Sequence, residues 1–333
     1  SGNGAFNLVE ATGNIGIAGL NLQGNMPALV KTATGAKSIT VAGAGLTSGT
    51  GASAVTLVAD TITLTGPVAI TGTGGPGTLT LAPTTLSRII NVGTGAGGLD
   101  FSNASLAQVT ATGLVFGSTL QTGNIVFKGA VPSTTQSVTA LQSTAGAGSI
   151  VLDDVAGTVA ALSVPTNNVS LTAGTGGIVA VSANNSRPEI LSTGNVTLNS
   201  SGAIGTTTNR IQLGGPSASV MVGNGSTPTG LALQMLGVTN GLNMDLVNVA
   251  GDIELVSAAG ITLNNNVTSG ASTTAKLVFN ADSDANGSGV FTLAAGKQIT
   301  TASTNHVTDV SGNQTGNPAC LLYTSDAADD TPC

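Results

Sequence analysis

The stretch STGNVTLNSSGAIGT, residues 192–206, contains the pattern that decides the fold. Within it, Val196 and Leu198 alternate with polar residues, so both aliphatic side chains fall on one face of an extended strand. The Gly, Asn and Ser residues on either side supply the positive φ angles and local hydrogen bonds that tight turns need. Almost nothing in the stretch could carry out acid–base chemistry. It predicts a short strand between two turns.

The same alternation recurs along the chain, bounded by Gly, Asn or Ser. Helices are not expected, because no segment sustains the three-to-four spacing of an amphipathic helix and Gly and Thr interrupt every window. The frequent Val, Ile and Thr residues also favour strands. The segments that we expect to be strands include SITVAG (38–43), VTLVAD (55–60), ITLTG (62–66), TLTLAP (78–83), NIVFKG (124–129), NVTLNSSG (195–202), DIELVSAAG (252–260) and KLVFNAD (276–282).

Many short strands with regular turns fit either a β-sandwich or a solenoid. A chain of 333 residues is long for one sandwich, and no charged or Pro-rich linker divides it. Similar bursts, IVF near 125, IVL near 150, VSL near 169 and VTL near 196, recur at about the 20 to 25 residues of one solenoid coil. We therefore predict an all-β fold, a parallel β-helix over residues 1–319. Its inward faces would stack Val on Val and Ala on Ala, and inward Asn would form amide ladders.

The composition limits the possible partners. Charged residues make up 7% of the chain, the formal net charge is −7, and the Lys and Arg residues are scattered from Lys31 to Lys297. Nucleic-acid binding needs clustered basic side chains, so we expect no nucleic-acid partner. No apolar run reaches the roughly 18 to 20 residues of a membrane helix, so we expect this fragment not to span a membrane.

The last residues depart from the Gly, Thr and Val composition of the rest. From Cys320 onward the sequence reads CLLYTSDAADD, which contains the only Tyr. Residues 320–330 resemble the in-frame translation of a transposase-type sequencing adaptor, so we predict that residues 320–333 are a non-native or disordered tail. Cys320 and Cys333 would then belong to no natural disulfide or metal site.

Strings such as GNVTLNSSGAIGT and LVFNADSDANGSG resemble the repeats of filamentous-haemagglutinin-like surface proteins and autotransporter passenger domains. The resemblance extends over residues 1 to about 319 and implies a right-handed parallel β-helix, here a fragment without its natural caps. It also implies a structural stalk or passenger segment of a large adhesin, secreted or anchored at the outer membrane of a Gram-negative bacterium. Its partners would be an outer-membrane secretion pore and glycans or proteins of a host cell, a neighbouring cell or the extracellular matrix.

One loop offers candidate ligands for a metal ion. In the stretch NADSDANGSG, Asp282, Asp284 and Asn286 alternate before a Gly, as in the first half of a calcium-binding loop. An EF-hand would place an acidic residue where the chain has Leu293. Two interpretations stay open: a weak calcium site, or an Asx-rich turn whose side chains bond to their own backbone. We expect no other cofactor.

Catalysis is not expected, although β-helices include polysaccharide-cleaving enzymes. Asp252 and Glu254 would share one strand face about 6.5 to 7 Å apart, a separation close to that of inverting glycosidases. Carbohydrate enzymes also need aromatic platforms and a cleft, and the chain has no Trp. His306, the only histidine, lies in a polar stretch typical of a loop. A β-helix polysaccharide-degrading enzyme and a self-assembling surface-layer protein are the alternatives to a non-catalytic adhesin.

Overall fold

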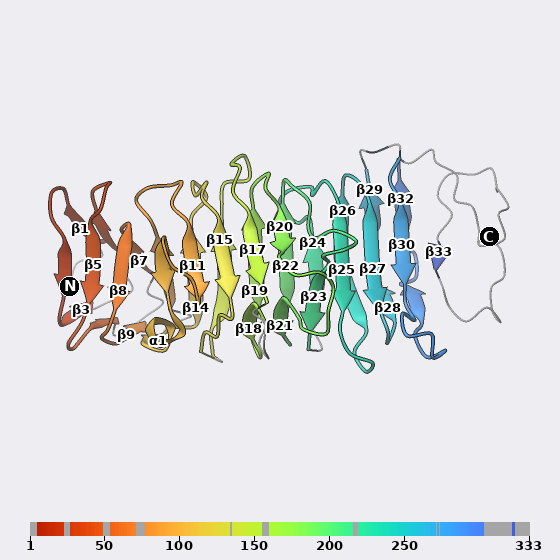
Figure 1. The fold of residues 1–333 in the computed structure, drawn as a ribbon, viewed down its shortest axis with the longest axis horizontal. Helices are drawn as coiled ribbons and strands as arrows, with labels where there is room; N and C mark the ends of the chain where they lie inside the picture. Colours follow the sequence, from red (N-terminus) through yellow and green to blue (C-terminus); the bar gives the residue numbers. More distant parts are fainter. Residues whose placement is uncertain are drawn as a thin grey trace.

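The computed structural model describes residues 5–22, 27–48, 54–70, 77–133, 135–154, 160–215, 219–270, 272, 274–302 and 322–323. In this part the chain winds into an elongated stack of coils whose strands run across the long axis (Figure 1). Strands of successive coils pair in parallel, as Phe6–Glu10 does with Ala28–Thr32. This architecture is a parallel β-solenoid, and it confirms the fold predicted from the sequence.

One face of the stack is a 14-stranded sheet, which we call the long sheet. Its successive strands come from successive coils. They are β1 (Phe6–Glu10), β4 (Ala28–Thr32), β7 (Ala54–Val58), β10 (Thr78–Ala82), β14 (Gly113–Gly117), β16 (Ser137–Leu141), β19 (Val169–Ala173), β22 (Val196–Ser200), β24 (Val220–Val222), β26 (Leu242–Val249), β28 (Ile261–Leu263) and β31 (Phe291–Leu293), with β29 (Val267–Ser269) beside β26 and β32 (Ile299–Thr301) beside β29.

Four shorter sheets form the other faces. A 3-stranded sheet contains β2 (Ile15–Ile17), β5 (Ser38–Val41) and β8 (Thr61–Leu64), and a 5-stranded sheet contains β11 (Ile90–Gly93), β12 (Leu99–Phe101), β15 (Ile125–Lys128), β17 (Ile150–Asp153) and β20 (Ile178–Ala180). A 4-stranded sheet contains β3 (Leu20–Leu22), β6 (Leu46–Ser48), β9 (Val68–Ile70) and β13 (Val109–Thr110). A 7-stranded sheet contains β18 (Leu162–Val164), β21 (Ile190–Ser192), β23 (Ile211–Gly214), β25 (Leu231–Met235), β27 (Ile253–Ser257), β30 (Leu277–Asn280) and β33 (Leu322–Tyr323).

The coils differ in length more than the sequence predicts. Leu79 pairs with Leu114, 35 residues later, whereas Leu114 pairs with Val138 after 24 residues and Leu242 with Ile261 after 19. The sequence predicts about 20 to 25 residues for every coil. The 35-residue coil also contains β11, β12 and the short helix α1 (Asn103–Leu106). The paired strands therefore keep their register while the segments between them absorb insertions.

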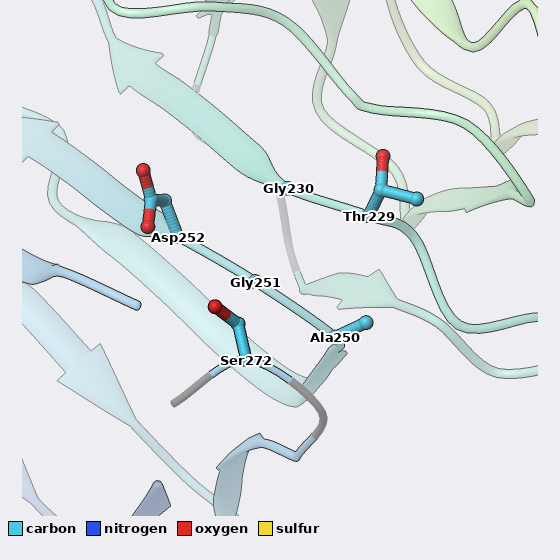
Figure 2. Close-up of a pocket in the computed structure, with 6 residues that line it drawn as sticks. All are labelled: Thr229, Gly230, Ala250, Gly251, Asp252 and Ser272. Carbon is cyan, nitrogen blue, oxygen red and sulfur yellow. The ribbon is translucent and has the colours of Figure 1, made fainter. Parts of the chain in front are cut away.

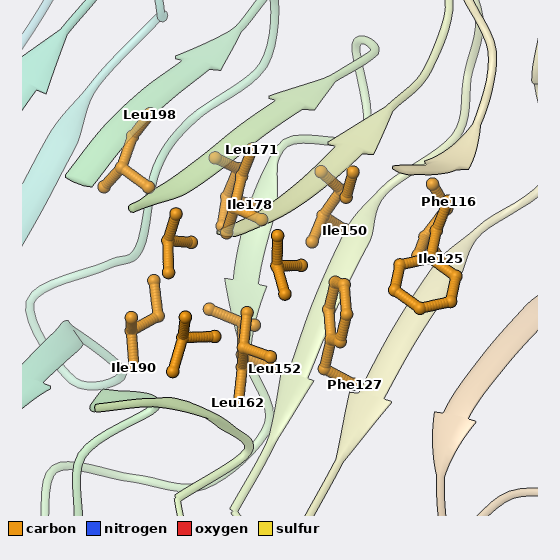
Figure 3. Close-up of a cluster of buried hydrophobic side chains, with 14 of the residues drawn as sticks. Phe116, Ile125, Phe127, Ile150, Leu152, Leu162, Leu171, Ile178, Ile190 and Leu198 are labelled. Atoms are coloured by element: carbon orange, nitrogen blue, oxygen red, sulfur yellow. The ribbon is translucent and has the colours of Figure 1, made fainter. Parts of the chain in front are cut away.

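Inward side chains form continuous rows along the stack. In the 5-stranded sheet, Ile90, Ile125, Ile150 and Ile178 are successive partners, and all four are fully buried. Figure 3 shows part of this core, where aliphatic side chains of successive strands lie beside one another. Their burial removes apolar surface from water, which stabilises the fold by roughly 25 cal/mol per Å². The predicted stacking of Val on Val is found where Val169 pairs with Val196 and Val196 with Val220. The predicted stacking of Ala on Ala is wrong for Ala28 and Ala140, which pair with Val55 and Leu171.

Phenylalanines pack together in one part of the core. Phe101, Phe116 and Phe127 are 1% exposed or less. The ring centroids lie 5.8 Å apart for Phe101 and Phe116, and 5.9 Å apart for Phe116 and Phe127, which is the usual range for aromatic packing. These three rings therefore serve packing and offer no exposed surface to a ligand.

Asparagine acts at the starts of strands rather than inside the core. At five positions a side-chain Oδ1 just before a strand accepts the backbone N–H at the equivalent position of the next coil, at 2.9 to 3.0 Å. The predicted inward amide ladders are wrong for the described residues, because aliphatic side chains fill the inward positions and only Asn91 among the asparagines is buried. The five residues that accept these bonds are called the strand-start residues below. They are Asn14, Asn124, Asn168, Asp252 and Asn266.

Replacing Asn168 by Ala is expected to loosen the start of β22. The substitution removes the acceptor of the Asn195 backbone N–H, which costs about 0.5 to 1.5 kcal/mol. Hydrogen exchange at the Asn195 amide, measured on the folded chain, should therefore become faster. Asn168→Asp keeps an acceptor oxygen, as Asp252 does in its own coil, and should exchange like the wild type. Equal acceleration in both variants would contradict the role of the side-chain oxygen.

Gly177 occupies a corner where a side chain does not fit, whereas Gly16 provides a matched control. The φ angle of Gly177 is +84°, and a Cβ there would lie 2.3 Å from the carbonyl oxygen of Ala203; a Cβ at Gly16 would meet nothing within 4 Å. Gly177→Ala is therefore expected to lower the midpoint of thermal unfolding, while Gly16→Ala should be neutral or stabilise by up to about 1 kcal/mol. Calorimetry of both variants tests this, and equal midpoints would contradict it.

Candidate functional site

The loop with the predicted calcium ligands lies between β30 and β31. Asp282 is 5% exposed, and its carboxylate accepts hydrogen bonds from the backbone N–H groups of Asn286 at 3.2 Å and Gly287 at 2.9 Å. The side-chain amide of Asn286 donates to Asp284 Oδ2 at 2.8 Å, and its Oδ1 accepts the backbone N–H of Ser288 at 2.8 Å. The three predicted ligands therefore lie in one loop and bond to that loop.

These bonds are typical of an Asx-rich turn, which includes Ala285 at a positive φ of 55°. A calcium ion needs about six to eight oxygen ligands, whereas the carboxylate of Asp282 already accepts two backbone N–H groups. Within the described ranges, no three His, Cys, Asp or Glu side chains are grouped so that they could hold a metal ion. A calcium site at Asp282, Asp284 and Asn286 stays a prediction.

Asp252 and Glu254 lie on the outward side of β27, because Ile253 between them faces the core. Asp252 is a strand-start residue that accepts the Lys276 N–H, and Glu254 forms an ion pair with Arg210 at 2.6 Å. Asp252 thus has its partner in the next coil, and Glu254 has its partner two coils earlier, across β25. An open hollow of about 360 Å³ beside them (Figure 2) is lined by Thr229, Gly230, Ala250, Gly251, Asp252 and Ser272. This lining has no aromatic platform for a sugar ring.

A polar cluster that the sequence does not predict lies on the outward side of β23. We call it the Glu189 cluster; it consists of Asp154, Asn185, Arg187, Glu189 and Gln212. Asn185 Nδ2 and Arg187 Nε donate to Asp154 Oδ2 at 2.8 and 3.3 Å. The backbone N–H of Gln212 donates to Glu189 Oε2 at 2.6 Å. Asp154, Glu189 and Gln212 are 2% exposed or less, whereas Asn185 and Arg187 are half-buried and lie at the edge of the cluster.

Two buried carboxyl groups of the chain have opposite pKa shifts. Burial raises the pKa of Glu189 to about 7, and the charge of Asp154 acts in the same direction. Burial alone would also raise the pKa of Asp60, but hydrogen bonds from the Thr85 hydroxyl at 2.6 Å and the Thr85 N–H at 2.7 Å hold it below its usual value. The backbone N–H groups of Gln212 and of Glu189 itself act in the lowering direction on the pKa of Glu189, and its Oε1 has no hydrogen-bond partner among the described residues. Burial therefore outweighs the hydrogen bonds at Glu189, whereas the hydrogen bonds outweigh burial at Asp60.

The predicted tail is almost entirely outside the described residues. His306, Cys320 and Cys333 all lie outside them. Within 320–333 only β33 is described, and its backbone pairs in parallel with β30. The assignment of these residues to a non-native or disordered tail stays a prediction.

No protein-family model matches the chain, and no curated protein or solved structure is similar enough to it to count as a match. In the part of the chain that the structure describes, no helix is long and apolar enough to cross a membrane. The fold, the loop at Asp282 and the Glu189 cluster are therefore the observations on which a functional proposal can rest.

Replacing Asp282 by Ala is expected to destabilise the last described coils. The variant leaves the backbone N–H groups of Asn286 and Gly287 without their acceptor, at a cost of about 1 to 3 kcal/mol. Asp284→Ala is the matched control, since that exposed carboxylate accepts only from a side chain, and it should change stability by less than about 0.5 kcal/mol. Thermal unfolding in a chelator measures both effects. A calcium-dependent rise of the midpoint that both variants abolish would instead support the metal site.

Proposed function

We propose that the chain is a structural stalk or passenger segment of a large adhesin, secreted or anchored at the surface of a Gram-negative bacterium. The observation that supports this most directly is the long sheet, whose strands pair in an unbroken series from β1 to β31. Strands that run across the rod place their mutual hydrogen bonds along its axis. Each coil is thereby held by its two neighbours, and such a rod can carry a binding surface away from a cell.

The proposed role is mechanical. In the long sheet, Leu57, Leu81 and Phe116 are successive inward partners and are fully buried. Opening one coil would therefore expose its own inward row and uncover those of its neighbours. Proteolysis requires such local opening, so the continuous core is expected to protect the rod against proteases outside the cell.

The outward face of the long sheet fits a neutral, polar partner. Thr56 pairs with Thr80, and farther along the stack Thr139 pairs with Ser170, which pairs with Thr197. These hydroxyl groups carry no charge and can both donate and accept hydrogen bonds. We propose glycans or proteins of a host cell, a neighbouring cell or the extracellular matrix as partners. Export through an outer-membrane pore is part of the same proposal, and catalysis is not.

Surface labelling tests the proposed location. Antibodies against the purified chain should label intact cells of the organism that encodes it, and beads coated with the chain should adhere to host cells or extracellular matrix. Rods should be visible when the purified chain is imaged by electron microscopy. Label confined to the cell interior would contradict the proposal.

The same purified chain separates the two alternatives. A surface-layer protein should assemble into a regular lattice, with or without added calcium, and a polysaccharide-degrading enzyme should release reducing sugar ends from soluble polysaccharides. We expect neither result. Hydrolysis that disappears in both Asp252→Asn and Glu254→Gln variants would replace the stalk proposal with an enzyme.

A further inference from the structure

The segment between β20 and β21, residues 181–188, covers the outward side of β23, and we call it the strap. Gln212 points outward from β23, since Ile211 and Leu213 on either side of it face the core, yet it is fully buried. Its side chain accepts the backbone N–H of Asn185 at 2.9 Å and donates to the carbonyl oxygen of Asn185 at 2.7 Å. This pair of bonds fastens the middle of the strap to β23.

A second set of bonds fastens the strap near the same point. The backbone N–H of Asn184 donates to the carbonyl oxygen of Thr208 at 2.9 Å, and Asn184 Oδ1 accepts the backbone N–H of Arg210 at 2.6 Å. These are hydrogen bonds between polar groups, without a large apolar side chain beneath them in the strap sequence VSANNSRP. Each such bond contributes about 1 kcal/mol, and further bonds run from Asn184 Nδ2 to the Thr207 carbonyl oxygen and from Asn209 Nδ2 to the Ser182 carbonyl oxygen, both at 2.9 Å, so the strap is held by polar bonds rather than by apolar burial.

The charges under the strap do not balance when every carboxyl group is ionised. Asp154, which follows β17, has Arg187 of the strap as its ion-pair partner, at 3.3 Å. Arg210, which precedes β23, pairs with Glu254 of β27 at 2.6 Å. Glu189 has no ion pair with any described residue, and its buried Oε1 has no hydrogen-bond partner there. An ionised Glu189 would therefore be a buried negative charge close to that of Asp154.

We propose that the strap is a proton-controlled latch, docked on β23 while Glu189 is protonated and released when Glu189 gives its proton to water. A protonated Glu189 is neutral and retains an oxygen to accept the Gln212 N–H. An ionised Glu189 regains hydration only if the cluster opens. Because the strap supplies Asn185 and Arg187 to the cluster, its release would open the cluster to water.

The pKa of Glu189 sets the range in which the latch works. In the docked state this pKa is raised to about 7, whereas the released, hydrated carboxyl group has its ordinary value of 4.5. Protons therefore favour docking. The contribution of Glu189 to docking is fully present below about pH 4.5, and docking becomes less favourable as the pH rises to about 7. With these two pKa values, the equilibrium constant for docking falls about tenfold between roughly pH 6 and pH 8.5.

Release would uncover a polar surface for a partner at alkaline pH. The side-chain amide of Gln212 donates to Gln234 Oε1 at 3.1 Å, so the two glutamines extend over neighbouring strands β23 and β25. With the strap released, these amides would become available for hydrogen bonds.

Hydrogen exchange of the strap tests the latch. In the full wild-type chain, protection of the Asn184 and Asn185 amides, corrected for the intrinsic pH dependence of exchange, should fall about tenfold between roughly pH 6 and pH 8.5. The Glu189→Gln variant has the same shape without a titrating group and should show constant protection. Glu10→Gln is the matched control: Glu10 is a solvent-exposed residue with a lowered pKa, and its variant should behave as the wild type.

Two results would overturn the latch: wild-type protection that does not change over this range, or an equal loss of protection in Glu189→Gln. Asp154→Asn provides a second variant in case Glu189→Gln does not fold. Burial is the main cause of the raised pKa of Glu189, and the variant removes the smaller contribution from the charge of Asp154, so the loss of protection should become somewhat smaller. An unchanged or larger loss in Asp154→Asn would also contradict the latch.

Discussion

The whole structure depends on one constraint, which is that the inward residues of each coil stay in register with those of the next. Parallel backbone bonds fix this pairing, and the two-residue period of a strand means that a slip of one residue would turn an inward row toward water. Val55 pairs with Leu79 after 24 residues and Leu79 with Leu114 after 35, and all three are fully buried. The number of residues in a coil can therefore vary, because the segments between the strands absorb insertions while the pairing of the inward residues stays fixed.

Neutral polar residues help the coils to stay in register. They form hydrogen bonds with backbone N–H and C=O groups at the turns without bringing charge into the core. Asn168 accepts a backbone N–H at a strand start, while at the end of another strand the Ser200 hydroxyl donates to the carbonyl oxygen of Gly174 at 3.1 Å. Gln142 Nε2 does the same for Gly123 at 2.6 Å. Backbone groups that a turn would leave unpaired thus find partners. This explains how a chain with 7% charged residues can be so rich in polar ones.

The parts of the structure that could be predicted are those with a local signal. Strands such as β5 and β22 follow from alternation within four or five residues, and the turn at Asp282 follows from closely spaced Asp, Asn and Gly. The segments LDF of β12 and NASL of α1 are too short to show a period, so the long coil could not be predicted. Asp154 and Glu189 are 35 residues apart and meet only after the chain has wound round the stack, so the Glu189 cluster left no pattern in the sequence.

The solenoid also explains why a titrating group can act locally. A pKa raised from 4.5 to about 7 corresponds to roughly 3 kcal/mol, at 1.36 kcal/mol for each pKa unit. That equals about three of the hydrogen bonds that hold the strap, so ionisation of Glu189 weakens docking measurably without outweighing all of these bonds. The same free energy is small beside the apolar burial that holds a coil between its neighbours. Since the backbone of each coil pairs only with adjacent coils, the cost is expected to stay close to β21 and β23 while the rest of the rod keeps its register.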